Sequence, residues 1–213
     1  MKYILGIDTS CYTTSMALVD LHGNLVFSSQ VPLEVKVGER GLQQSKALFQ
    51  HLHRLPSFTE KVANFIQPKE DIAAICSSSR PRPLSDSYMP VFMVSHLVGQ
   101  AFANMLGIPY YSVSHQENHI QAGQFSAQGP KCSNFLTIHL SGGTTELLNV
   151  TDRNAAFDID ILGGTQDLHA GQFVDRVGVA IGLPFPAGPY LEEYALEGRE
   201  GMVTIPSYVK GLT

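Results

Sequence analysis

Cysteine is scarce in this sequence, and the few cysteines present do not suit a disulfide scaffold. There are three, Cys11, Cys76 and Cys132, an odd number separated by long intervals in a chain of 213 residues. Small secreted proteins that depend on disulfides carry dense, even sets of cysteines. We therefore expect these residues to be reduced thiols, as in a cytosolic protein.

A long uninterrupted apolar run is also missing. The longest apolar stretch is Met89–Met105, and four polar residues interrupt it: Ser95, His96, Gln100 and Asn104. A helix that crosses a membrane needs about 20 predominantly apolar residues. Residues 1–7 are too short for the core of a signal peptide and are predicted to form a strand. These features favour a cytoplasmic protein.

Basic residues are few, which limits how the chain can meet nucleic acid. It has 14 Lys and Arg against 19 Asp and Glu, and a formal net charge of -5. Non-specific binding to nucleic acid depends on Lys and Arg that neutralise phosphates, so RNA contact would need a local patch or a basic partner. The two local concentrations, Arg80–Arg82 and Lys46–Arg54, are more simply explained as solvated loop and helix surface.

The pattern of apolar residues predicts an α/β protein with two similar halves and a cleft between them. The expected elements of the first half are strands Tyr3–Ile7, Ser15–Val19 and Leu25–Ser28, helices Leu42–Leu55 and Phe58–Phe65 separated by Pro56, strand Asp71–Cys76, helix Met89–Leu106 and strand Ile108–Val113. The expected elements of the second half are strands Phe135–Leu140, Glu146–Val150 and Ala156–Ile161, helix Asp167–Ile181 capped by Thr165, and a short helix near Glu192. We place the halves at 1–130 and 131–213 and expect the second half to be incomplete.

Two turns rich in hydroxyl groups occupy equivalent places in the two halves. The first, Gly6–Thr14, includes Thr9 and Ser10, and the second is Ser141-Gly142-Gly143-Thr144. Backbone amides and hydroxyls in such turns bind phosphate, and glycines allow close approach of an anion. Ser and Thr are also common in tight turns for local reasons, but the repetition favours phosphate binding.

His115 and His119 are spaced to share one face of a helix, a geometry that can hold one metal ion. Glu117 lies roughly 200° around the helix from His115, away from that face, whereas zinc proteases of the HExxH type place their glutamate beside the metal. The spacing is therefore poor evidence for a protease. Taken without context, the pair is better explained as two surface histidines.

Asp175 and Gly188 form a further candidate pair. Asp175 lies on a predicted helix from which a carboxylate can bind both hydroxyls of a ribose. Gly188, between prolines, permits close approach of a flat ring. Asp175 could equally be a solvated residue paired with Arg176 or Arg199.

Together these segments resemble the TsaD family, formerly called O-sialoglycoprotein endopeptidase. The matching motifs are Gly6–Cys11, His115-x-Glu117-x-His119, Ser141–Thr145, Ala170–Asp175 and Pro186–Pro189. The resemblance implies an actin-like, sugar-kinase-like (ASKHA) fold that binds ATP or an adenylate. It implies iron or zinc on His115 and His119, phosphate at Ser141–Gly143, and a nucleoside at Asp175 and Gly188.

The sequence also departs from the family pattern. Tyr12 and Thr13 stand where the family usually has acids, Thr144 replaces a histidine, Gln172 a glutamate and Ala187 a glycine. By the resemblance, the family's third metal ligand and a nucleotide-binding asparagine lie beyond Thr213. We therefore expect a divergent, carboxyl-terminally shortened member.

Three functions follow as hypotheses. The first is threonylcarbamoyl transfer from an adenylate to an adenosine of tRNA, with the metal polarising the carbamoyl carbonyl. The second is a non-catalytic scaffold similar to the TsaB proteins, and the third and weakest is a glycoprotein metalloprotease. The expected partners are a second copy of the chain or a TsaB-like protein, with tRNA reached through a local patch or through that partner.

Overall fold

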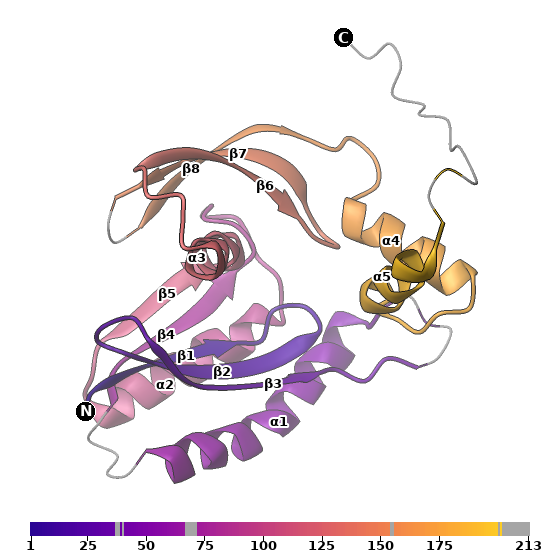
Figure 1. Ribbon diagram of the computed structural model, residues 1–213. Helices are drawn as coiled ribbons and strands as arrows, with labels where there is room; N and C mark the ends of the chain where they lie inside the picture. The colour runs from indigo at the N-terminus through magenta and orange to yellow at the C-terminus, as the bar shows by residue number, and fades with distance from the viewer. Residues whose placement is uncertain (37–38, 40, 67–71, 154–155, 200, 202–213) are drawn as a thin grey trace.

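The computed structural model describes residues 1–36, 39, 41–66, 72–153, 156–199 and 201, and two β-sheets organise this part of the chain (Figure 1). The first sheet has the order β3-β2-β1-β4-β5, formed by β1 (Tyr3–Asp8), β2 (Thr13–Asp20), β3 (Leu25–Pro32), β4 (Ile72–Arg80) and β5 (Tyr110–Ser114). The second has the order β6-β7-β8, formed by β6 (Asn134–Leu140), β7 (Thr145–Asp152) and β8 (Phe157–Gly164). The helices are α1 (Gln44–Phe65), α2 (Phe92–Leu106), α3 (His115–Ala127), α4 (Ala170–Ala180) and α5 (Gly188–Glu197).

The first sheet joins an antiparallel meander to two parallel strands. β1, β2 and β3 pair antiparallel, and β1, β4 and β5 pair parallel. Side chains on one face of the sheet, such as Leu5 and Met16, pack with Phe58 of α1 and Val94 of α2 in the main core. α3 contacts β4, β5 and β6, and it lies between the two sheets (Figure 1).

The prediction that Pro56 ends a helix is wrong. A single helix, α1, runs through Pro56, although proline removes one hydrogen-bond donor from a helix interior. Pro56 is on the exposed side of α1, while His51, Leu55 and Phe58 continue one buried face across it. Packing of that face against the sheet outweighs the local preference of proline.

Other boundaries also differ from the predicted ones. β4 extends to Arg80 because Ser77 and Ser78 continue its pairing with β5; Asp71 lies outside the described residues. Thr165 does not cap α4, whose N-cap is His169, and the Thr165 hydroxyl donates instead to Asp167. α2 ends as predicted at Gly107, which has a φ of 65°.

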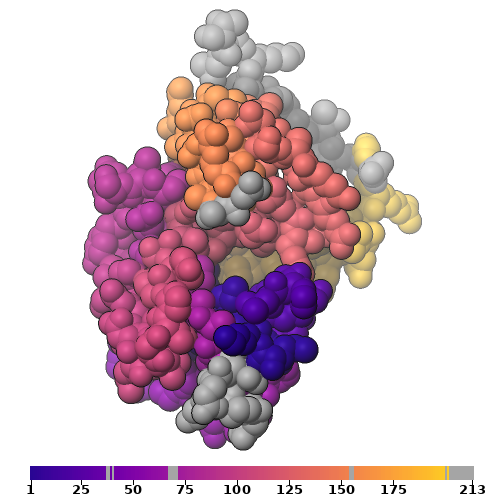
Figure 2. Space-filling model, turned by 90° about the vertical axis from the view of Figure 1, so that its left-hand side faces the viewer, coloured from indigo at the N-terminus to yellow at the C-terminus, as the bar shows by residue number. Residues whose placement is uncertain are grey.

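The described residues cover one face of the second sheet and leave its other face exposed. Leu148 and Val150 of β7 pack with Ile120 of α3. On the opposite face Ile138 lies directly across from Leu147, and both side chains are exposed. The space-filling view shows orange residues of this sheet above the indigo amino-terminal residues (Figure 2).

The predicted division at residue 130 falls between β5 of the first sheet and β6 of the second, but as a domain boundary it stays a prediction. No helix in the described part of the chain is long and apolar enough to cross a membrane. Residues 202–213, at the end of the predicted second half, lie outside the described residues.

Candidate functional site

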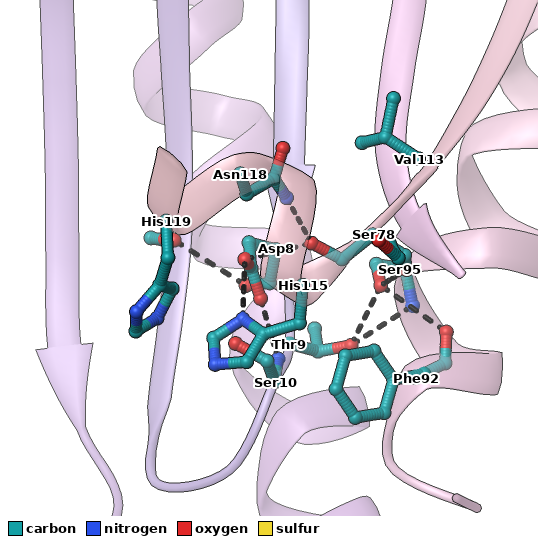
Figure 3. A network of polar contacts seen from close by, with 12 residues as sticks. Asp8, Thr9, Ser10, Ser78, Phe92, Ser95, Val113, His115, Asn118 and His119 are labelled. Carbon is teal, nitrogen blue, oxygen red and sulfur yellow. Dashed lines mark hydrogen bonds and ion pairs between the residues drawn. The ribbon is translucent and has the colours of Figure 1, made fainter. Parts of the chain in front are cut away.

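The first turn is organised by Asp8, at the carboxyl end of β1 (Figure 3). One carboxylate oxygen of Asp8 accepts a hydrogen bond from the amide of Ser10 at 2.5 Å, and the other accepts from the hydroxyl of Ser78 at 2.8 Å. Asn118 of α3 donates to the same Ser78 hydroxyl. The carboxylate therefore links the turn to β4 and, through Ser78, to α3.

Thr9 is directed into the interior rather than toward the site. Its side chain is fully buried, and its hydroxyl donates to the carbonyl of Val91 at 2.8 Å and contacts Ser95. Thr9 therefore has only its backbone to offer a ligand. On the other side of the turn, buried His51 contacts the carbonyl of Cys11 at 3.3 Å, so α1 helps to hold the turn.

His115 and His119 lie on one face of α3, as their spacing predicted. Their ring centroids are 4.1 Å apart. Nδ1 of His115 faces the carboxylate of Asp8 at 3.9 Å, too far for a hydrogen bond but within range of an ion pair. Glu117 points elsewhere, because it forms a capping box with Ser114 at the start of α3. That role removes the glutamate that a metalloprotease mechanism would use.

The second turn, Ser141–Thr144, satisfies several of its donors internally. The Ser141 hydroxyl oxygen accepts from the amides of Gly143 at 3.1 Å and Thr144 at 2.9 Å, and it contacts the Thr144 hydroxyl at 2.8 Å. The start of α4 also touches this turn, since the amide of Gly171 donates to the Ser141 carbonyl at 3.1 Å. A phosphate bound here would have to replace the internal bonds of the turn.

His139 of β6 joins the second turn to the histidine pair. Its Nδ1 is 3.1 Å from the Thr144 hydroxyl, and its Nε2 is 3.2 Å from Nδ1 of His119. His139 is buried because the alternation of β6 turns it toward α3. Three imidazoles therefore follow one another between the two turns.

A second polar link joins the first half to the second sheet. Arg82 forms an ion pair with Glu146 of β7 at 2.5 Å, and the Gln116 side-chain amide donates to Glu146 at 2.9 Å. Arg82 is therefore engaged in an internal contact. Arg82 was one of the basic residues considered for RNA contact, and this ion pair means that it does not offer a free positive charge.

Asp175 and Gly188 lie at the junction of α4 and α5. A carboxylate oxygen of Asp175 accepts from the amide of Ala187 at 2.8 Å, directly before Gly188. The ring of Tyr12 packs edge-on against Phe185 with centroids 5.1 Å apart. This loop therefore touches the first turn as well as α4.

These contacts close a ring around the candidate site. The first turn reaches α3 through Asp8 and His115, α3 reaches the second turn through His139, and the second turn reaches α4 through Gly171. α4 and the loop before α5 then return to the first turn through Phe185 and Tyr12. The structure thus brings together all the segments that the sequence singled out.

The pKa values of Asp8, His115 and His119 are shifted in different directions by their surroundings. Burial disfavours the charged form of Asp8, but the neighbouring imidazole of His115 and the Ser10 amide outweigh it and lower the pKa of Asp8 to about 2. Burial also disfavours charge on His115, yet Asp8 and the nearby Cys11 raise the pKa of His115 to about 9. Burial and the charge of His115 lower the pKa of His119 to about 4.

The histidine pair fits part of a metal site. Nδ1 of His115 is buried and makes no hydrogen bond within the described residues, and the two rings adjoin on one helix face. Among those same residues, however, no set of three His, Cys, Asp or Glu side chains is arranged to hold an ion. The pair supplies at most two ligands, fewer than the three protein ligands usual at catalytic zinc.

Sequence reasoning missed two residues of this ring, Asp8 and His139. Asp8 was visible as the last residue of an apolar strand, a position that often faces a ligand. His139 lies on the same face of β6 as Phe135 and Thr137, which indicates an inward side chain. Its contact with His119, across 20 residues of sequence, could not be read from spacing.

The comparison with protein families decides the relationship. A model of the TsaD family, described as tRNA N6-adenosine threonylcarbamoyltransferase, matches residues 26–212. The chain belongs to the TsaD family. A member from Prochlorococcus marinus (strain MIT 9312), named tRNA N6-adenosine threonylcarbamoyltransferase, is 31% identical over 97% of this chain and 57% of its own length. One of the same name from Thermodesulfovibrio yellowstonii is 34% identical over 95% of this chain and 59% of its own length. The chain thus spans little more than half the length of these relatives.

Solved structures support the fold that TsaD membership implies. The ethanolamine utilization protein EutJ from Carboxydothermus hydrogenoformans is similar with a TM-score of 0.52 and 13% identity, over 91% of this chain and 62% of its own. A ROK family protein from Streptococcus pneumoniae, solved with sucrose, is similar with a TM-score of 0.51 and 14% identity, over 92% and 68%. Both have the actin-like fold, so the predicted ASKHA fold is confirmed.

Proposed function

We propose that this chain provides the nucleotide- and metal-binding part of a threonylcarbamoyl transferase that acts on adenosine of tRNA. The observation that carries this proposal is the closed ring of contacts, in which two hydroxyl-rich turns meet through three histidines. Family membership supports the reaction class.

The roles of the residues follow from their chemistry. The hydroxyl of Ser10 and the amides and hydroxyls of Ser141–Thr144 would bind the phosphates of ATP or the phosphate of an adenylate. One carboxylate oxygen of Asp175 accepts a hydrogen bond from the Ala187 amide, and the other can accept from ribose hydroxyls. Gly188 directly follows Ala187. His115 and His119 would hold iron or zinc, which as a Lewis acid supplies polarisation of the carbamoyl carbonyl.

A scaffold role, like that of TsaB proteins, is the alternative. One observation favours it: Tyr12, which replaces a family acid, packs on Phe185 as a structural contact in the first turn. A scaffold needs no transfer chemistry, so the two proposals differ in a measurable product.

The deciding experiment supplies the protein with threonylcarbamoyl-adenylate and unmodified tRNA and quantifies the modified adenosine by mass spectrometry. We expect product with the wild-type chain and at least tenfold less with His119→Asn. His53→Asn, which changes a histidine of α1 outside the site, is the matched control. A folded wild-type protein that binds the adenylate but yields no product would refute the transferase and favour the scaffold.

A further inference from the structure

Arg82 and Glu146 join two segments that lie directly beside the candidate phosphate turns. Arg82 follows β4, and Ser78 of that strand donates to Asp8 of the first turn at 2.8 Å. Glu146 lies in β7, directly after the second turn, Ser141–Thr144. We propose that the Arg82–Glu146 ion pair fixes the distance between the two turns, so that the site selects ligands with linked phosphates over a single phosphate. The inference rests on the proposed function and specifies which ligands its site prefers.

Both carboxylate oxygens of Glu146 contact residues of the first half. One oxygen is 2.5 Å from Nη2 of Arg82, and the other accepts from the side-chain amide of Gln116 at 2.9 Å. The Glu146 side chain is only 9% exposed. A carboxylate removed from water requires charged or hydrogen-bonding partners. Since both partners belong to the first half, Glu146 ties β7 to that half.

The two partners of this carboxylate are themselves held in place. Arg82 lies between Pro81 and Pro83, and a residue that precedes proline has a restricted backbone. The amide of Arg82 also donates to the hydroxyl of Ser87 at 2.9 Å. The amide of Gln116 donates to the carbonyl of Pro81 at 3.1 Å. The two partners therefore form one hydrogen-bonded unit, against which the carboxylate is positioned.

Other contacts between the halves constrain the distance between the turns less. Ile120 of α3 packs on two apolar residues of β7. Apolar contacts are non-directional, so they hold the second sheet without fixing its exact position. His119 and His139 are 3.2 Å apart at the same junction, but a contact between two imidazoles does not join opposite charges. Charge-assisted hydrogen bonds are about twice as strong as neutral ones, so the Arg82–Glu146 pair determines the position of the second turn.

A ligand with linked phosphates depends on the distance between the turns, whereas a single phosphate does not. In the proposed site, one phosphate of ADP would contact the Ser10 hydroxyl and the other would contact Ser141–Thr144. Without the ion pair, the turns adopt the correct distance for only part of the time. The affinity for ADP falls in proportion to that fraction. Inorganic phosphate occupies one turn at a time, so its affinity is independent of the distance.

The test compares ADP with inorganic phosphate on the wild-type protein and on Arg82→Gln. Titration of nitrogen-15-labelled protein, followed at the Gly142 and Gly143 amides, measures both affinities. We expect Arg82→Gln to weaken ADP binding about tenfold and phosphate binding less than about twofold. The matched control is Arg153→Gln, because Arg153 forms an exposed ion pair with Asp158 in the same half. It should leave both affinities unchanged.

Two further variants separate the ion pair from a general loss of structure. Arg82→Lys keeps the positive charge and should recover at least part of the affinity for ADP. Glu146→Gln should weaken ADP binding in the same direction as Arg82→Gln, and combining the two should cause little further loss, because one interaction is removed in each case. Circular dichroism checks that each variant is folded. If Arg82→Gln does not fold, Glu146→Gln provides the same comparison between ADP and phosphate.

Two kinds of result would overturn the inference. Equal losses of ADP and phosphate affinity in a folded Arg82→Gln, or no loss of either, would refute control of the distance by the ion pair and leave the proposed function intact. Failure of the folded wild-type protein to bind ADP, or to bind phosphate at the second turn, would refute both.

Discussion

Asp8 connects the first turn with the histidine pair, and the charges of Asp8 and His115 make the free energy of unfolding depend on pH. Its pKa is lowered from 3.8 to about 2, so its contribution to the free energy of unfolding is present above 3.8 and lost as the pH falls through 2. The pKa of His115 is raised from 6.5 to about 9, so its contribution is present below 6.5 and lost as the pH rises through 9. The pair therefore stabilises the protein most between these ordinary values, 3.8 and 6.5.

We predict that Asp8→Asn lowers the free energy of unfolding by on the order of 2 kcal/mol near about pH 5.5 and by clearly less near about pH 9.5. Urea unfolding at both pH values measures the difference. Asp158→Asn is the control, because Asp158 and Arg153 form an exposed ion pair that contributes little. An equal effect of Asp8→Asn at both pH values would contradict the account.

At the scale of elements, the contact between α4 and the second turn depends on the absence of a side chain at Gly171. A Cβ there would lie 2.6 Å from the amide nitrogen of Gly142 and 2.7 Å from the carbonyl oxygen of Ser141. Both atoms belong to the backbone, so the helix or the turn would have to move. The start of α4 is therefore fixed by the shape of the turn.

We predict that Gly171→Ala lowers the free energy of unfolding by about 1–3 kcal/mol. Gly123→Ala is the matched control within α3, where a Cβ meets no atom within 4 Å, and it should raise the same quantity by up to about 1 kcal/mol. Chemical denaturation of both variants measures this. If Gly171→Ala is as stable as Gly123→Ala, the close contact between α4 and the turn is not real.

Elements were predictable where the apolar pattern alone decides them. The alternation in β2 is of this kind, whereas the face shared by His115 and His119 was predictable from their spacing. The continuity of α1 through Pro56 was not predictable, because it depends on how its buried face meets the sheet. The contacts of Asp8 and His139 likewise depend on strand order and on the placement of α3, which the spacing of residues does not contain.

On the scale of the whole molecule, the outer face of the second sheet is a broad apolar surface. Leu136, Ile138 and Leu140 alternate along β6 with more than half of each residue exposed, and Leu147 lies beside them. Contiguous apolar patches on a protein surface commonly mark a contact with another protein. The predicted homodimer or TsaB-like partner would cover this face.

We predict that the protein self-associates at high concentration and that Ile138→Lys, at a position 67% exposed, shifts it toward monomer. Multi-angle light scattering measures the mass. Leu21→Lys, at a similarly exposed position in the β2–β3 turn and outside the second sheet, should leave the mass unchanged. A monomeric wild-type protein at high concentration would count against self-association through this face.

The central claim is that the two turns and the histidine pair form one nucleotide site, and titration of nitrogen-15-labelled protein with ADP tests it most directly. The account predicts that the amides of Ser10, Gly142 and Gly143 and the ring of His119 all shift along one binding curve. Weak affinity is expected, because the second turn must exchange its internal bonds for bonds to phosphate. Shifts confined to one turn, or none at either, would contradict the claim.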